Sequence, residues 1–332
     1  MCGIAGLSLA PDEKCAPTRI AAAMLRMIEH RGRDATGAAW VAPQSLAVYF
    51  QKDNVPASKF IPMLNLEGAR TAILHTRYGT KGTATNPANN HPIVLPGMVG
   101  IHNGMLRNDD ALFAMLGEGT TRYGQVDSEA AFALLNADDK TPTTHRLGMI
   151  EGSAALAWLN VDDEGCSDRV LHLARVSSSP LWIGSTPKGS LLFGSTRGTI
   201  EAGARVIGAR LQFVQEVSEG TYLRVHRGKV VEWTAIPGRV PAAPKPVTHS
   251  RPLTTTTTPT RGPLHGVTDL FDKGSKSAPK DTPNPAAETF HKAPWKKAEQ
   301  IAARVVETVS DRRNYSTWDR DWWASKGRDG RK

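Results

Sequence analysis

The chain has 332 residues, of which 40% are hydrophobic and 22% are charged, with a formal net charge of +9. This composition is typical of folded globular proteins and excludes fibrous, wholly disordered and membrane-spanning classes. No window holds the ~18 uninterrupted apolar residues of a membrane helix, and residues 1–10 lack the basic start and apolar run of a secretory signal. We therefore expect a cytoplasmic protein that has no membrane partner.

The first 237 residues contain short apolar strand-like runs and three helical patterns, with no internal repeat. The strands gather in clusters and do not alternate strictly with helices, which favours an α+β domain built from packed sheets. The predicted helices cover about 18–30, 107–117 and 127–136. The predicted strands are 4–9, 37–41, 46–50, 72–75, 154–161, 170–176, 191–194, 221–225 and 229–233.

The composition changes near residue 238. Residues 1–237 hold 23 basic and 22 acidic side chains, whereas the last 95 residues hold 18 basic and 10 acidic ones, so the basicity belongs to the tail. Residues 238–294 contain all ten prolines of the tail and the threonine run 254–258, which predicts a disordered or extended linker. Residues 295–332 begin with a helical pattern and end among tryptophans and charges.

Three interpretations of this basic tail stay open. It docks on a partner protein, it is an inert solvated arm, or it binds nucleic acid. Nucleic-acid binding is the least favoured, because acidic residues are interleaved with the basic ones and no RNA-binding or helix-turn-helix signature is present.

Cys2 directly follows the initiator methionine and precedes an apolar strand. Because cysteine is small, we expect Met1 to be removed, which leaves a thiol and a free α-amine on the same residue. An α-amine titrates near ~7.7–8.0 and a thiol near ~8.5, so the amine can act as the base for its own side chain. The alternative is a buried structural cysteine. Together with Cys15 and Cys166 it forms no CxxC pair and no metal-ligand spacing, so we expect no metal, no cofactor and no disulfide framework.

Two further motifs place cationic side chains beside predicted strands. The sequence HRGRDATG at 30–37 contains two glycines that permit a tight turn, which would bring Arg31 and Asp34 against the chain terminus. The sequence HTRYGTKG at 75–82 leaves a strand with Arg77 at its end. An arginine there is suited to bind a substrate carboxylate with two parallel hydrogen bonds.

Two more motifs supply polar groups of other kinds. A predicted loop at 101–105 offers the amide of Asn103 next to the backbone N–H of Gly104, the pair of donors that an oxyanion hole requires. Asp127 begins a predicted helix, where it either caps the helix or binds a substrate ammonium.

Together and in this order, these motifs resemble the glutaminase domain of class II glutamine amidotransferases, the N-terminal-nucleophile enzymes of the glucosamine-6-phosphate synthase and amidophosphoribosyltransferase kind. The resemblance covers about residues 2–235 and implies a four-layer αββα sandwich, with a glutaminase domain at 2–237. The segments that carry it are MCGIAG, HRGRDATG, HTRYGTKG, NNHP, HNGML and DSE, with SSSPLWIG and SEGTYLRV as weaker matches.

The resemblance implies that Cys2 attacks the side-chain amide of L-glutamine and forms a thioester with release of ammonia. Asn103 and Gly104 would hold the tetrahedral oxyanion, and Arg31 would position the terminal cysteine. His91 and His102 are expected to order loops and not to act as bases.

For substrate binding, the resemblance implies that Arg77, helped by Thr80, pairs with the α-carboxylate of glutamine. Asp127 would take the α-ammonium, and Tyr78 and Gly104 would line the site. Two positions depart from the family pattern, which often has Trp in place of Tyr78 and, in the synthase branch, His in place of Lys81. An aromatic wall survives at the first position, while Lys81 leaves the branch of the family open.

The final 95 residues contain no P-loop, no pyrophosphatase signature, no phosphoribosyl-binding run and no sugar-isomerase domain. We therefore expect ammonia to pass to a separate partner synthase. A stand-alone glutaminase is the alternative. A third hypothesis is a pseudoenzyme that acts as a binding module through its basic tail, although every residue that carries the chemistry is present.

Overall fold

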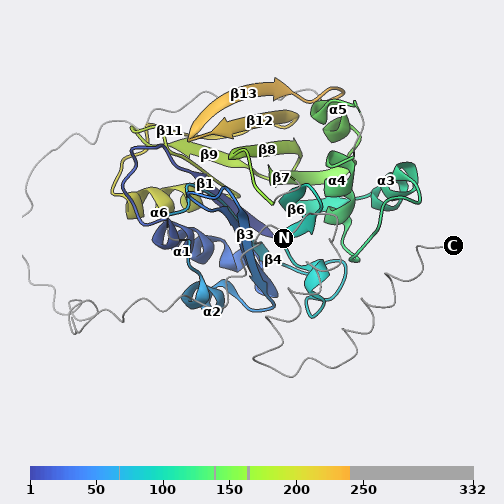
Figure 1. Cartoon of the computed structure of the whole chain (residues 1–332), viewed down its shortest axis with the longest axis horizontal. Coiled ribbons are helices and arrows are strands. Elements are labelled where there is room, and N and C mark those ends of the chain that lie inside the picture. Colours follow the sequence, from blue (N-terminus) through green and yellow to red (C-terminus); the bar gives the residue numbers. More distant parts are fainter. Residues whose placement is uncertain (67, 138–139, 163–164, 240–332) are drawn as a thin grey trace, which may run out of the picture.

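The computed structural model describes residues 1–239, except 67, 138–139 and 163–164 (Figure 1). The predicted linker from residue 240 onward and the predicted C-terminal helix lie outside the described residues. The domain boundaries at 237 and 294 accordingly stay predictions.

The first of two sheets has seven antiparallel strands, and the strand that follows Cys2 lies in its middle. Its two neighbours, near residues 71–77 and 191–194, come from distant parts of the sequence. The strand order is β11 (Phe213–Glu216), β9 (Trp182–Ser185), β10 (Leu191–Gly194), β1 (Gly3–Ser8), β4 (Thr71–Arg77), β2 (Ala35–Val41) and β3 (Val48–Asp53).

The second sheet has six strands, also paired antiparallel. Its order is β13 (Lys229–Ala235), β12 (Thr221–His226), β8 (Val170–Ser177), β7 (Gly152–Asn160), β6 (Met98–Leu106) and β5 (Ile93–Leu95).

Helices cover the outer face of each sheet, which gives four layers in the order helix, sheet, sheet, helix (Figure 1). The first sheet is covered by α1 (Pro17–Ile28), α2 (Ala57–Phe60) and α6 (Arg197–Ile207). The second is covered by α3 (Asp109–Leu116), α4 (Asp127–Leu135) and α5 (Thr143–Gly148). Three short 3₁₀ helices complete the described part, η1 (Glu29–Arg31), η2 (Ile61–Met63) and η3 (Pro87–Asn89).

Three apolar clusters hold these layers together, one between the sheets and one under each helical layer. Strand β7 belongs to two of these clusters, because its alternate residues point to opposite faces of the sheet. Ala157 and Leu159 enter the core between the sheets, whereas Leu156 and Trp158 face the helices. Burying one such leucine fully contributes ~1.5–3 kcal/mol. A strand buried on both faces is apolar along its whole length and does not alternate with polar residues.

The α+β sandwich predicted from the sequence is confirmed, as are the helices at α1, α3 and α4 and the nine predicted strands. The prediction of a loop at 101–105 is wrong, because these residues lie inside β6. Besides β6, three strands and three helices were missed: β5, β9, β11, α2, α5 and α6. The three missed strands have only three or four residues each, too few to show a periodic pattern.

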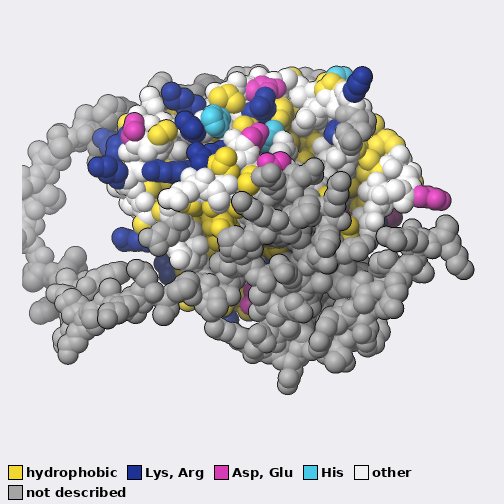
Figure 2. Space-filling model, in the orientation of Figure 1, with side chains coloured by type: hydrophobic (Ala, Val, Ile, Leu, Met, Phe, Trp, Pro, Cys, Tyr) yellow, Lys and Arg dark blue, Asp and Glu magenta, His cyan; other side chains and the backbone are white. Residues whose placement is uncertain are grey.

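Within the described residues, no helix is both long and apolar enough to cross a membrane. On the face shown in Figure 2, Lys and Arg side chains gather over the end of the molecule where β9 and β11 lie. Residues 1–237, although nearly neutral by count, therefore carry an uneven surface charge.

Candidate active site

The backbone of Cys2 is fixed where β1 begins. Gly3, the first residue of β1, pairs with Thr76 near the end of β4. The Nε of Arg31, at the end of η1, donates a hydrogen bond of 2.9 Å to the carbonyl oxygen of Cys2. Gly32 permits this approach, because a Cβ at that position would lie 2.3 Å from the carbonyl carbon of Arg77.

The thiol of Cys2 lies against the backbone of the residue that follows β4. Its Sγ is 3.4 Å from the amide nitrogen of Tyr78 and 3.5 Å from its carbonyl oxygen. Burial raises the pKa of the Cys2 thiol, against the lowering effects of the Tyr78 hydrogen bond and the positive charge of Arg77, while Asp127 adds to the rise. Both the positive charge of Arg77 and the negative charge of Asp127 thus act on the pKa of the thiol. With its pKa raised, the thiol needs a base to become a nucleophile at neutral pH.

Arg77 is 3% exposed, and it organises the loop that follows β4. Its Nη2 donates to the carbonyl oxygens of Lys81, at 2.8 Å, and Gly82, at 2.7 Å, and its Nη1 donates to Oδ1 of Asn90 at 3.2 Å. Burial lowers the pKa of Arg77, and the negative groups near it oppose that change. The guanidinium therefore has a structural task in this loop besides the expected binding of a carboxylate.

Tyr78 and Thr80 are exposed on the same loop. Tyr78 is 54% exposed, and its backbone contacts the Cys2 thiol. Asp34, predicted to lie against the terminus, accepts a hydrogen bond of 2.7 Å from the amide of Gly79 and so holds this loop close to the turn at 30–37.

Asn103 lies in β6 with no exposed surface, and neither amide atom of its side chain has a hydrogen-bond partner among the described residues. A buried polar group without a partner costs ~1–3 kcal/mol, so its presence calls for an explanation. Next to it, Gly104 has φ = +148°, and a Cβ there would lie 1.8 Å from the carbonyl oxygen of Ser153. Only glycine is accommodated at this point of β6.

Asp127 is the first residue of α4 and is 8% exposed. Its Oδ2 accepts a hydrogen bond of 2.6 Å from the amide of Leu106, at the end of β6, and its Oδ1 accepts one from Ser128 at 3.0 Å. The carboxylate thereby ties the start of α4 to the strand that carries Asn103. The N-cap residue of α4 is Val126, so the alternative that Asp127 caps the helix is wrong. Binding of a substrate ammonium by Asp127 stays a prediction.

Three buried histidines surround these residues. The Nε2 of His75 is 3.0 Å from the carbonyl oxygen of His102, which joins β4 to β6 across the two sheets, and the ring of His75 stacks on that of His91 at 4.0 Å. The Nδ1 of His102 is 2.8 Å from Oγ of Ser128. Burial lowers the pKa of all three rings, that of His75 to about 3. They are neutral at physiological pH and order the surrounding backbone.

Sequence reasoning missed Lys52, which reaches this region from β3. Its Nζ donates to the carbonyl oxygens of Asn90, at 2.8 Å, and Pro92, at 2.9 Å, and burial lowers its pKa to about 7. It therefore fastens the segment that also holds Arg77. The strand at 48–53 gave no signal that one of its polar side chains turns inward. The ammonium of Lys81, on the loop after β4, pairs with Asp109 of α3.

The described residues contain no group of three or more His, Cys, Asp or Glu side chains arranged to hold a metal ion.

No family model matches the sequence. A glutamine–fructose-6-phosphate aminotransferase (isomerizing) of Corynebacterium diphtheriae is 32% identical to the chain over 142 residues, which are 41% of the chain and 23% of that protein. The solved glutamine phosphoribosylpyrophosphate amidotransferase from B. subtilis, in complex with ADP and GMP, matches with a TM-score of 0.56 at 19% identity. A second solved structure, an allosteric regulatory enzyme of purine biosynthesis, matches with a TM-score of 0.56 at 18% identity.

Each structural match covers 71% of the chain and 49% of the solved one. The chain thus spans about a quarter of the curated relative and about half of the solved structures. The low identity to the solved structures shows the fold alone, whereas the aminotransferase also shares sequence. The chain therefore has the N-terminal-nucleophile hydrolase fold and resembles the class II glutamine amidotransferases in both sequence and architecture.

Proposed function

We propose that the chain is a glutamine amidotransferase that hydrolyses L-glutamine to L-glutamate and ammonia through a thioester on Cys2. The observation that carries the proposal is that the charges of both Arg77 and Asp127 act on the Cys2 thiol, the first lowering its pKa and the second raising it. Free glutamine carries a carboxylate and an ammonium on its α-carbon. A site with one cation and one anion beside a nucleophile therefore matches this substrate and disfavours an amide within a protein chain.

The base in this mechanism is the α-amine of Cys2 itself, once Met1 has been removed. Met1 is 71% exposed, which leaves it open to an aminopeptidase. The Cys2 thiol has a raised pKa and is protonated at neutral pH, so its proton must move as sulfur attacks. The amine takes that proton, and the Sγ–C bond forms to the side-chain carbonyl carbon of glutamine. The carbonyl π electrons move onto oxygen, which becomes an oxyanion.

The oxyanion is held by the side-chain amide of Asn103 and the backbone N–H of Gly104. This assignment explains the unpartnered amide of Asn103, since its partner would be the oxyanion that forms only during the reaction. One such donor commonly lowers the barrier by ~2.7–4 kcal/mol. The C–N bond then breaks, the protonated α-amine gives its proton to the departing nitrogen, and ammonia leaves.

Hydrolysis of the thioester uses the same groups in reverse order. The α-amine takes a proton from water, the resulting hydroxide oxygen attacks the thioester carbonyl, and the Cys2 sulfur leaves with that proton as glutamate is released. No imidazole is needed in either half of the cycle, which agrees with the low pKa of the buried histidines.

We further propose that the ammonia is used by a synthase on a separate chain. The stand-alone glutaminase is the second candidate, and the two are distinguished by whether the glutaminase rate rises when candidate synthases are added to the purified protein.

The proposal is tested by intact-mass measurement together with a glutamate-release assay on the full-length protein. We expect a mass without Met1, release of glutamate and ammonia in equal amounts, and stoichiometric alkylation of Cys2 by a glutamine-like diazo-ketone. A mass that includes Met1, or a blocked Cys2 amine, contradicts the mechanism because the proposed base would not exist.

A further inference from the structure

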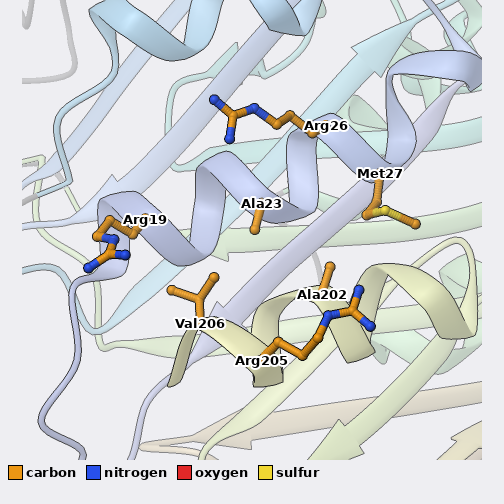
Figure 3. A pocket seen from close by; sticks show the side chains of 7 residues that line it. All are labelled: Arg19, Ala23, Arg26, Met27, Ala202, Arg205 and Val206. Atoms are coloured by element: carbon orange, nitrogen blue, oxygen red, sulfur yellow. The ribbon is translucent and has the colours of Figure 1, made fainter. Parts of the chain in front are cut away.

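A surface groove of about 450 Å³ lies between α1 and α6, on the helical layer that covers the first sheet (Figure 3). It shares no residue with the candidate active site. Its volume is near the lower end of the ~300–1,000 Å³ that ligand pockets occupy, so it is large enough for one short segment of a partner and not for a broad interface. Four lining residues come from α1 and three from α6: Arg19, Ala23, Arg26, Met27, Ala202, Arg205 and Val206.

The spacing of these residues makes the groove a regular feature of the two helices. Arg19, Ala23 and Arg26 stand at positions i, i+4 and i+7, so they lie on one face of α1. A rise of 1.5 Å per residue separates the two arginines by ~10 Å along the helix axis, or two turns. Arg205 lies in the last turn of α6 and lines the same groove.

None of the three arginines has an acidic partner in the part of the chain that the structure describes. No side-chain hydrogen bond or ion pair joins Arg19, Arg26 or Arg205 to another described residue. Elsewhere on α6, Arg197 is paired with Glu201 at 2.7 Å, so that carboxylate is already engaged. Three unpaired cations around one groove attract an anionic occupant and repel a basic one.

The groove also has an apolar lining, formed by alanines, Val206 and Met27, which is 37% exposed. Small residues leave room for the side chains of an occupant, and methionine adapts to their shape. An apolar floor with flanking cations is complementary to an amphipathic helix that carries carboxylates beside its apolar stripe. The basic tail of this chain, with 18 basic and 10 acidic residues after position 237, has the wrong charge for this groove.

We propose that the groove between α1 and α6 is a docking site for an acidic amphipathic helix of another protein. Its apolar side chains fill the floor, and its carboxylates pair with Arg19, Arg26 and Arg205, each guanidinium offering two parallel hydrogen bonds. This inference goes beyond the proposed glutaminase activity and does not depend on it.

The test is a fluorescence-anisotropy titration of full-length protein with a labelled helical peptide that has Leu at i and i+4 and Glu at i+7 spacing. A second peptide has Gln in place of every Glu. The groove variant is Arg19→Glu with Arg205→Gln. The control variant, Lys59→Glu with Arg210→Gln, makes the same change in net charge at exposed positions outside the groove. The tail is identical in all proteins, so any binding it contributes cancels.

We expect the groove variant to bind the Glu peptide at least about tenfold more weakly than wild type, with the control variant unchanged and the Gln peptide weakly bound by all three. Circular dichroism checks that the variants are folded. Equal affinity of wild type and groove variant for the Glu peptide overturns the proposal. The proposal is also overturned if wild type does not bind the Glu peptide but binds inorganic phosphate or a 20-base-pair DNA duplex, and the groove variant loses that binding.

Discussion

The Nε of Arg31 lies 2.9 Å from the carbonyl oxygen of Cys2 and donates a hydrogen bond to it. This bond joins the last residue of η1 to the backbone of the candidate nucleophile, which directly precedes β1. It fixes the direction in which Cys2 presents both its side chain and its nitrogen.

Replacing Arg31 by Met should therefore lower kcat with little change in KM. The methionine keeps an apolar stem but leaves the Cys2 carbonyl without its donor. A hydrogen bond to a charged group contributes about 1.5–3 kcal/mol, which corresponds to about a tenfold to hundredfold loss of rate. Arg33→Met is the control, because Arg33 is 71% exposed and its ion pair is with Glu29, away from Cys2. A normal kcat in Arg31→Met would remove Arg31 from the mechanism.

Replacing Asn103 by Leu should lower activity without lowering stability. The variant loses a proposed oxyanion donor, which costs about 10²–10³ in kcat, but it also removes two buried amide atoms that have no partner. Thermal unfolding should therefore show an unchanged or higher Tm.

Asn89→Leu is the matched control for this prediction. Asn89 is equally buried, but its side chain donates to Thr83 and accepts from the amide of Gln125. The same substitution should lower the Tm there. If Asn103→Leu loses stability as Asn89→Leu does, the amide of Asn103 has a structural role in place of a catalytic one.

Arg77→Lys should chiefly raise the KM for glutamine. The planar guanidinium of Arg77 contacts Lys81, Gly82 and Asn90 and still has other N–H groups that can bind a carboxylate. A lysine carries its three N–H groups on one nitrogen and cannot reproduce this arrangement. Steady-state kinetics of Arg70→Lys give the comparison, since Arg70 also donates to two carbonyl oxygens but at Ala10 and Glu13. An unchanged KM in Arg77→Lys would show that the carboxylate binds elsewhere.

The pH dependence of kcat/KM should report the α-amine of Cys2. An α-amine titrates near ~7.7–8.0 and accepts a proton only when it is neutral, so the rate should rise with pH through that range and level off above it. The thiol has a pKa raised by burial and stays protonated over this range. A rise centred near pH ~6.5 would instead indicate a solvent-accessible histidine as the base.

Gly104→Ala should destabilise the domain. The new methyl group would meet the carbonyl oxygen of Ser153 at 1.8 Å and would have to adopt φ = +148°, which together cost about 2–4 kcal/mol. Gly119→Ala is the control, because a Cβ there meets nothing within 4 Å. Urea unfolding of both variants measures the difference, and equal stabilities would mean that β6 and β7 separate easily at this point.

The sequence by itself determined the class of the domain and most of its elements. The run GIAGLS and the helix that starts at Asp127 were predicted near their observed positions, because long apolar runs and helix starts depend on nearby residues. The sequence motifs also named Cys2, Arg31, Arg77, Asn103 and Asp127 as candidates, although their roles stay proposals.

Tertiary structure alone decided how these residues are supported. Lys52 contacts Asn90 and Pro92 across some forty positions of sequence, and the segment 101–105 is held as a strand by its pairing with β7. Such contacts depend on strand pairing between distant segments, which no local pattern records. The same holds for the groove between α1 and α6. Its three arginines belong to no motif in the sequence, and only the packing of the two helices makes them line one groove.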